Sequence, residues 1–412
     1  MKLPAFLRRA GVAFLSMGGQ AASAFVLTIV VSRAVDPSVR GEFVLLTLIP
    51  QIGAYIATLG LPGAVMRGAA AAPEQRSALL GASAIASGFA AVVLTALTPL
   101  VMHLSHSPTP SIALVFGETG AIVLLIFLSW FAYGCERFIL AGVLRMAPIL
   151  AAALAIVALD LAGETGLTTM FTPWAGFHLL VATLGGAYLF RRDGVARPNL
   201  AQAREWISYG LRYSTIQLLN LITLRFDQLI LGWLGTTAAV GVYSIAASLS
   251  EGILLATAAI GLIVFLDSAK EGVGNPFRRK LILTVLASSA AAALLALVAG
   301  PLVQLLFGER YDSAAALTRI LSIGVPGLVV LRMITNRLAG ANQPGVASIY
   351  ALVTLVVTTG LDLILIPSHG ATGAAWASAV GYNLGGATAL LTMRWAIRRG
   401  RPGLATPSSV PA

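Results

Sequence analysis

The sequence predicts an all-α integral membrane protein with about 12 transmembrane helices in two six-helix lobes and with both termini in the cytoplasm. Three observations lead to this fold class: the composition, the spacing of apolar stretches and the distribution of basic residues. Hydrophobic residues make up 58% of the 412-residue chain and charged residues only 10%, whereas a soluble domain carries about 25% charged residues. A chain this apolar belongs in a lipid bilayer for most of its length.

Apolar stretches between charged or turn-forming clusters give the expected helices in order. A bilayer core of about 30 Å needs roughly 20 apolar residues per helix, and twelve stretches are long enough. They cover residues 10–32, 42–66, 78–102, 111–133, 138–160, 168–190, 207–232, 239–266, 281–307, 314–338, 346–367 and 371–396. The first stretch continues past the small residues at 22–24, so we expect a retained helix rather than a cleaved signal peptide.

The basic residues predict the orientation. With the N-terminus in the cytoplasm, nineteen of the 27 lysines and arginines lie in inside segments, four in outside segments and four within the spans. This asymmetry follows the positive-inside rule and predicts that both termini face the cytoplasm. The basic loops account for most of the formal net charge of +11 and are expected to contact anionic membrane lipids. No nucleic-acid partner is expected.

The widest inner connection, residues 191–206, separates six spans from six. We therefore expect an N-terminal lobe over residues 1–195 and a C-terminal lobe over 196–412 that ends in a short basic tail. A shift of 200 residues aligns Gly41-Glu42-Phe43 with Gly241-Val242-Tyr243, each of which opens an inward-going helix. Because six spans separate these motifs, the repeat would be parallel, with its axis along the membrane normal.

Sequence signals of enzymatic chemistry are missing. No lysine follows a glycine as in a phosphate-binding loop, and neither His-Glu-x-x-His nor Gly-x-Ser-x-Gly occurs. The single cysteine cannot form an internal disulfide. We expect no enzyme, no cofactor and no metal site. A membrane glycosyltransferase or polymerase is a less favoured alternative, because its catalytic residues need a sizeable extramembrane loop and the outside loops here are short.

Charged residues inside the spans are the main functional candidates, since each costs about 2.5–3.5 kcal/mol to insert. Arg145, Arg212 and Arg332 each lie one to two turns from the cytoplasmic end of a span. Their guanidinium groups would form a positive vestibule open to the cytoplasm, or each would snorkel to lipid phosphate along its helix. The sequence leaves both interpretations open.

The seventh span carries a polar stripe of Tyr213, Gln217, Asn220 and Asp227 at helical spacing, which must face a cavity or another helix. Arg225 lies about 200° round the helix from Asp227, so we expect it to point elsewhere and to reach the surface. The candidate substrate-binding residues are Arg145, Arg332, Arg212, Arg225, Gln217 and Asn220.

Three acids are candidates for ion coupling. Glu251 lies near the middle of the eighth span on a face shared with Ser244 and Ser248, and Asp227 is the second candidate. Glu118, in the outer half of the fourth span, is the comparable acid of the first lobe. A carboxyl at such depth either serves transport or belongs to a structural ion pair, and both alternatives remain open for each acid.

Several motifs resemble those of a known family. Residues 26–67, with Ser32-Arg33, Gly41-Glu42-Phe43 and Leu59-Gly60-Leu61, resemble the opening of the polysaccharide flippases, which belong to the multidrug/oligosaccharidyl-lipid/polysaccharide exporter superfamily. Further similar motifs are residues 227–232, 240–244, 306–311, 366–367 and 370–375. Asp362 departs from the pattern, because asparagine is usual there, and so does His369, where an aromatic residue is common.

The resemblance implies two lobes around a central cavity and movement of undecaprenyl-diphosphate-linked oligosaccharide from the cytoplasmic to the outer leaflet of the bacterial inner membrane. Such a flippase serves lipopolysaccharide or exopolysaccharide synthesis, with a polysaccharide polymerase and assembly proteins as candidate partners. It also implies coupling to H+ or Na+ through buried acids. A drug or cation exporter of the same superfamily is the nearest alternative, although an acidic cavity would suit it better than an arginine-lined one.

Overall fold

The computed structural model describes residues 3–58, 60–104, 111–270, 277–340 and 343–398, and within these ranges some helical side chains, including those of Arg212 and Gln217, lie outside the description. The regular structure in these ranges is entirely helical, which confirms the all-α class. The chain divides into two compact units, Met1–Leu218 and Leu219–Ala412. This division falls inside one helix, whereas the lobe boundary expected from the sequence lies at 195/196 and stays a prediction.

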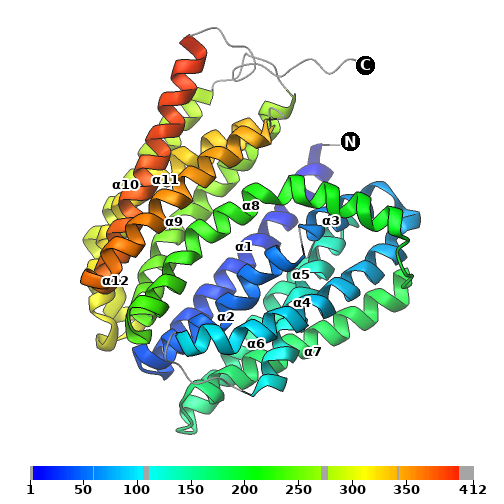
Figure 1. The fold of residues 1–412 in the computed structure, drawn as a ribbon, viewed down its shortest axis with the longest axis horizontal. Coiled ribbons are helices and arrows are strands. Elements are labelled where there is room, and N and C mark those ends of the chain that lie inside the picture. The colour runs from blue at the N-terminus through cyan, green and yellow to red at the C-terminus, as the bar shows by residue number, and fades with distance from the viewer. Residues whose placement is uncertain (1–2, 59, 105–110, 271–276, 341–342, 399–412) are drawn as a thin grey trace. The chain divides into compact units, whose positions relative to one another are not determined.

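The first unit is built around one central helix. Its elements are α1 (Leu3–Ala34), α2 (Pro37–Ala57), α3 (Leu61–Ala71), the 3-10 turn η1 (Pro73–Gln75), α4 (Arg76–Leu104), α5 (Ile112–Gly134), α6 (Phe138–Leu161), α7 (Leu167–Asp193) and the first part of α8 (Leu200–Leu234) (Figure 1). Helix α5 packs against α3, α4, α6 and α7. Its Phe127, Leu128 and Phe131 are fully buried in the hydrophobic core, so side chains on α5 lie deep inside the unit.

The second unit is organised around α11. It contains the remainder of α8, α9 (Thr237–Lys270), α10 (Phe277–Phe307), the 3-10 turn η2 (Glu309–Tyr311), α11 (Ser313–Gly340) and α12 (Pro344–Arg398). Helix α11 packs against α9, α10 and α12. Glycines allow the closest of these approaches: a Cβ at Gly324 of α11 would lie 2.8 Å from the Ala379 Cα of α12. The unit therefore brings α9, α11 and α12 together at short range.

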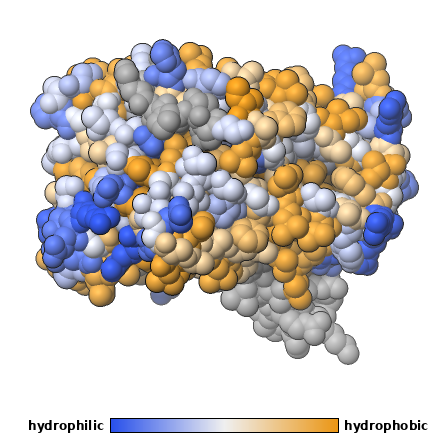
Figure 2. All heavy atoms as spheres, turned by 90° about the horizontal axis from the view of Figure 1, so that it is seen from below, coloured by the Kyte–Doolittle hydropathy of each residue, from blue (hydrophilic) through white to orange (hydrophobic). Residues whose placement is uncertain are grey.

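The helices have the length and composition of membrane spans. Eight helices in the described ranges are long and apolar enough to cross a bilayer. Many large apolar side chains on them are exposed, among them Leu154, Leu297 and Ile364, and Figure 2 shows that apolar residues cover much of the face in view. These features support a multi-pass membrane protein, while the count of 12 and the orientation stay predictions.

One expected span differs from the helices in the structure, and two others meet at a non-helical glycine. The stretch 42–66 is interrupted after Ala57, and α3 starts only after Gly60, whose φ of 73° is left-handed. The stretches 346–367 and 371–396 are two helices, as expected: α12 is broken at Gly370, whose φ of 52° and ψ of −133° are not helical. Glycine is required at both places because other residues rarely adopt positive φ.

Candidate functional site

An ion pair joins α8 to α9 in the second unit. The Arg225 guanidinium donates two hydrogen bonds to the Glu251 carboxylate, at 2.5 Å from Nη1 to Oε1 and 2.8 Å from Nη2 to Oε2. Each side chain is 25% exposed, so the pair is accessible from outside. Helical spacing predicts that Arg225 points to the surface. In the structure its long side chain extends to α9 instead, because the rotamer of a long side chain decides where its end group lies and the helical position alone does not.

Asp227 lies on the same helix and is almost completely buried, with 4% of its surface exposed. Its carboxylate accepts hydrogen bonds from the Tyr243 hydroxyl of α9, from the Ser378 hydroxyl of α12 at 3.2 Å and from the Gln228 backbone N–H at 2.7 Å. All three donors are neutral groups. Asp227 thus connects three helices through neutral hydrogen bonds, whereas Glu251 is held by a cation.

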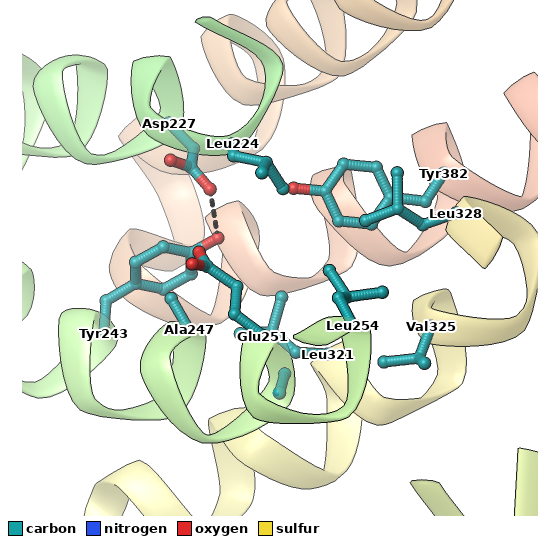
Figure 3. Close-up of a pocket in the computed structure, with 11 residues that line it drawn as sticks. Leu224, Asp227, Tyr243, Ala247, Glu251, Leu254, Leu321, Val325, Leu328 and Tyr382 are labelled. Atoms are coloured by element: carbon teal, nitrogen blue, oxygen red, sulfur yellow. Dashed lines mark hydrogen bonds between the residues drawn. The ribbon is translucent and has the colours of Figure 1, made fainter. Parts of the chain in front are cut away.

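A pocket opens beside both carboxylates. Its polar lining consists of Asp227, Tyr243, Ser250, Glu251 and Tyr382. Its apolar lining consists of Leu224, Ala247, Leu254, Leu321, Val325 and Leu328. Figure 3 shows the Tyr243 hydroxyl bonded to Asp227, with Glu251 and Tyr382 extending into the same region. The Ser250 hydroxyl is buried without a hydrogen-bond partner in the described part of the chain. The pocket therefore contains a hydroxyl group that can still form hydrogen bonds with a ligand.

Arg332 of α11 supplies a second cation near this pocket. Its half-buried guanidinium forms no hydrogen bond or ion pair with the residues that the structure describes, yet it lies within electrostatic range of Glu251 and Arg225. Of these two guanidinium groups, only that of Arg225 is directly paired with a carboxylate among the described residues. With Asp227 and Glu251, the region holds two carboxylates and two guanidinium groups, and Arg332 is the cation without a direct partner among the described residues, so it is available to an anionic ligand.

Asp362 is a functional candidate that the sequence interpretation treated only as a departure from a family pattern. It lies on α12, is 2% exposed, and its Oδ1 has no hydrogen-bond partner within the described ranges. It is also within electrostatic range of Asp227. The signal that singles out Glu118 and Glu251, a lone acid in an apolar span, applies equally to Asp362 and would have found it.

Two further candidates, Glu118 and Arg145, belong to the first unit. Glu118 of α5 is 1% exposed, and its carboxyl group accepts hydrogen bonds from Trp174 and Thr119. Arg145 of α6 is half-buried and has no ion pair in the described residues. The vestibule that would join Arg145 to Arg332 stays a prediction.

The remaining candidates lie on α8. Asn220 is half-buried and makes no hydrogen bond with the described residues. Arg212 and Gln217 belong to α8 by their backbone, but their side chains lie outside the described residues. Of the nine candidates, the structure thus brings four into one region of the second unit: Arg225, Asp227, Glu251 and Arg332.

This region can exchange partners without making or breaking covalent bonds. An entering anion can take Arg225 from Glu251, because a guanidinium binds phosphate oxygens with the same two-pronged geometry as a carboxylate. Protonation of Glu251 would release Arg225 in the same way. The described residues contain no cluster of three or more metal-ligating side chains. The chemistry available is reversible binding of anions and of a proton or cation.

Comparisons with known proteins agree with this fold. The structure is similar to an inward-facing multidrug resistance MATE family transporter of the MOP superfamily, with a TM-score of 0.70 and 16% identity over 92% of this chain and 95% of that one. It is similar to the lipid II flippase MurJ in an inward closed conformation, with a TM-score of 0.72 and 12% identity over 94% and 87%.

A third similar structure is a mutant of the Vibrio cholerae MATE transporter VcmN, with a TM-score of 0.61 and 15% identity over 95% and 96% of the two chains. At these identities the likeness concerns the fold. A search among curated proteins returned no match. A sequence model described as "Polysaccharide biosynthesis protein" matches residues 6–265, which is more than half of the chain. The chain therefore belongs to this polysaccharide biosynthesis family and has the fold of MOP-superfamily transporters.

Proposed function

We propose that this protein flips undecaprenyl-diphosphate-linked oligosaccharide from the cytoplasmic to the outer leaflet of the bacterial inner membrane by ion-coupled alternating access. The observation that carries this proposal is the Arg332 guanidinium, which has no hydrogen-bond partner among the described residues and lies in range of the Arg225–Glu251 pair. A diphosphate is an anion with several acceptor oxygens, and arginine is the side chain best suited to bind it. The family and the flippase among the similar structures support a lipid-linked sugar as substrate.

Coupling is proposed to involve the acids, with Glu251 first, Asp227 second and Glu118 in the first unit, and with H+ or Na+ as the ion. Glu251 holds Arg225 while the anion is absent. When the diphosphate binds Arg225, Glu251 loses its cation. Its surroundings contain too little water to solvate the freed carboxylate well, so a proton or sodium ion then stabilises it. Substrate binding at Arg225 would therefore be linked to the ionisation state of Glu251. A polysaccharide polymerase and assembly proteins are the proposed partners.

The test uses the full-length chain in proteoliposomes with a fluorescent undecaprenyl-diphosphate oligosaccharide in the inner leaflet. Arg332→Ala should slow translocation about 10- to 100-fold, the loss expected for charge-assisted hydrogen bonds worth about 1.5–3 kcal/mol. Arg332→Lys should recover only part, because lysine lacks the two-pronged geometry. Arg394→Ala removes an exposed arginine of α12 and is the matched control, with expected wild-type rates.

The same vesicles, with and without an imposed pH or sodium gradient, test the coupling. Glu251→Gln should still bind substrate but should lose the acceleration that a gradient gives to wild type. An equal gradient response in both proteins would remove Glu251 from coupling. Translocation of organic cations but not of the lipid-linked sugar would instead favour the drug exporter, and Arg332→Ala would then leave the rate unchanged.

A further inference from the structure

The first unit contains a buried polar cluster of its own, on α5 and α7. The Glu118 carboxyl group, 1% exposed, accepts a hydrogen bond from the Trp174 indole Nε1–H at 3.1 Å and another from the Thr119 hydroxyl at 3.3 Å. The Phe43 ring packs edge-on against Trp174, with 5.8 Å between centroids. Two neutral donors and aromatic rings therefore surround this acid.

His178 completes the cluster one turn further along α7. Its ring packs against Trp174 at a tilt of 51° with centroids 4.1 Å apart, and its Nδ1 lies 2.7 Å from the Trp174 carbonyl oxygen. Because a carbonyl oxygen only accepts, Nδ1 carries the hydrogen. His178 is only 6% exposed, and in the described structure it forms no ion pair with Glu118. The imidazole therefore positions Trp174 instead of neutralising Glu118.

No other described charge reaches Glu118. Its interactions in the described ranges are the hydrogen bonds with Trp174 and Thr119. The other described titratable side chains on the helices packed against α5, none of which acts on its carboxyl group, are Arg40, Glu42, Arg67, Arg76, His103, Arg145, Asp160, Tyr188, Arg191, Arg192 and Asp193. Glu118 thus differs from Glu251, which has a guanidinium, and from Asp193, which is paired with Arg137.

We propose that Glu118 is a proton-binding site of the first unit and carries a proton in this conformation. An ionised carboxylate sealed from water without a cation costs several kcal/mol even after the protein relaxes, and protonation removes that cost. Glu118 keeps its two acceptor bonds when protonated, because the carboxyl group still offers lone pairs to the indole and the hydroxyl.

The donor set selects a proton over sodium. Sodium needs several oxygen ligands with free lone pairs, whereas the indole N–H is a donor only and points its hydrogen at Oε1. The His178 Nδ1–H is likewise turned to the Trp174 carbonyl and occupies that oxygen. Among the described residues the Glu118 carboxyl group contacts one N–H hydrogen and one hydroxyl group, which is too few oxygen ligands for Na+, whereas H+ needs none beyond the carboxyl group itself.

The role of this proton in transport rests on the proposed function. A conformation in which water reaches α5 would allow Glu118 to ionise, whereas this conformation holds the neutral acid. Release and uptake of one proton would then accompany the change between the two conformations. Coupling in the first unit would thus act through the exposure of one side chain, independently of the anion at Arg225.

The test is infrared difference spectroscopy of the full-length protein in lipid vesicles between pH 5 and 9, which detects the carbonyl stretch of a protonated carboxyl group without any transport. Glu118→Gln should lose one such band, since its amide keeps the shape and the acceptor oxygen for Trp174. Glu164→Gln, at an exposed acid between α6 and α7, is the matched control and should keep every band. Identical spectra for wild type and Glu118→Gln would overturn the proposal.

A second variant covers poor folding of Glu118→Gln. Trp174→Phe removes only the indole donor, so the carbonyl band of Glu118 should move to higher frequency. If no band moves in this variant, Glu118 is not protonated and the proposal is wrong. In parallel, the melting temperature of wild type should fall more steeply with rising pH than that of Glu118→Gln, because the native state retains a proton that the unfolded chain releases. Failure of lipid-linked sugar translocation would leave these spectra unchanged and would count against the proposed function alone.

Discussion

At the scale of single residues, the two carboxylates of the pocket are held by different chemistry. Glu251 accepts two charge-assisted hydrogen bonds from Arg225, whereas Asp227 accepts bonds from two hydroxyl groups and one backbone N–H. Neutralising Glu251 leaves the charged Arg225 guanidinium without its counter-ion. Neutralising Asp227 affects only neutral hydrogen-bond donors, which carry no charge to balance. The stability of the protein should therefore depend on the two side chains to different degrees.

We expect Glu251→Gln to destabilise the protein by about 1–3 kcal/mol, less than the loss for a fully buried pair because water partly reaches the site. Asp227→Asn should cost about 1 kcal/mol, since one of its three donors loses an acceptor. Melting temperatures in lipid nanodiscs measure both. The double variant Arg225→Gln with Glu251→Gln should recover part of the loss, and strictly additive effects would contradict a direct ion pair.

At the scale of helices, the contact between α11 and α12 positions Asp227's partner Ser378 and the pocket residue Tyr382. Gly324 allows this contact, because a Cβ there would lie 2.8 Å from the Ala379 Cα, which is backbone and cannot turn aside. Gly381 has the same role within α12, where an added Cβ would lie 2.5 Å from Thr358 Cγ2. Close helix approach through small residues is typical of membrane proteins.

Gly324→Ala should therefore destabilise the second unit by about 1–3 kcal/mol, the usual cost of overpacking, and should loosen the hydrogen bond from Ser378 to Asp227. Gly360→Ala is the matched control, because nothing lies within 4 Å of its added Cβ; it should be neutral or stabilise α12 by up to about 1 kcal/mol. Thermal unfolding and lipid-linked sugar translocation measure both variants. Equal behaviour of the two alanines would show that α11 and α12 do not need this close approach.

The sequence predicts the helices well and their interruptions only in part. Apolar runs identify the long helices because a bilayer demands about 20 apolar residues per crossing, and they place the break at Gly370 between two stretches. They do not separate α3 from α2, because the interruption at Gly60 depends on a positive φ angle, which hydropathy does not encode. The Arg225–Glu251 pair is missed for a related reason: side-chain length and rotamer choose the partner after the helices have packed.

At the scale of the whole molecule, the polar groups separate into those inside the units and those at helix ends. Glu118, Asp227 and Asp362 are buried in the described structure, and composition alone identifies them as unusual because acids inside spans are rare. Their hydrogen-bond partners, Trp174 for Glu118 and Tyr243 for Asp227, come from other helices. Sequence reasoning therefore finds Glu118 and Asp227 but neither Asp362 nor the hydrogen-bond partners, since only packing sets which helices meet.

The orientation of the whole chain is predicted from the arginines at helix ends. Arg191 and Arg192 end α7, and Arg197 and Arg204 follow in the connection to α8 and its start. Positive residues near helix ends stay on the cytoplasmic side during insertion. The connection after α6, in contrast, contains Glu164 and no lysine or arginine between residues 161 and 167, as expected for an outside loop.

Reporter fusions should thus place loops 67–77, 191–206 and 267–280 in the cytoplasm and loops 33–41, 161–167 and 308–313 outside. Replacing Arg191, Arg192 and Arg197 together by glutamine should reduce the fraction of chains with 191–206 inside, because the local charge bias drops while the apolar spans remain. Glutamine at Arg310 and Arg319, two of the few outside arginines, is the control and should leave the topology unchanged. An external signal from 191–206 in the unmodified chain would reverse the orientation and would place the Arg332 side of the second unit away from the cytoplasm, where a cytoplasmic diphosphate could not reach it first.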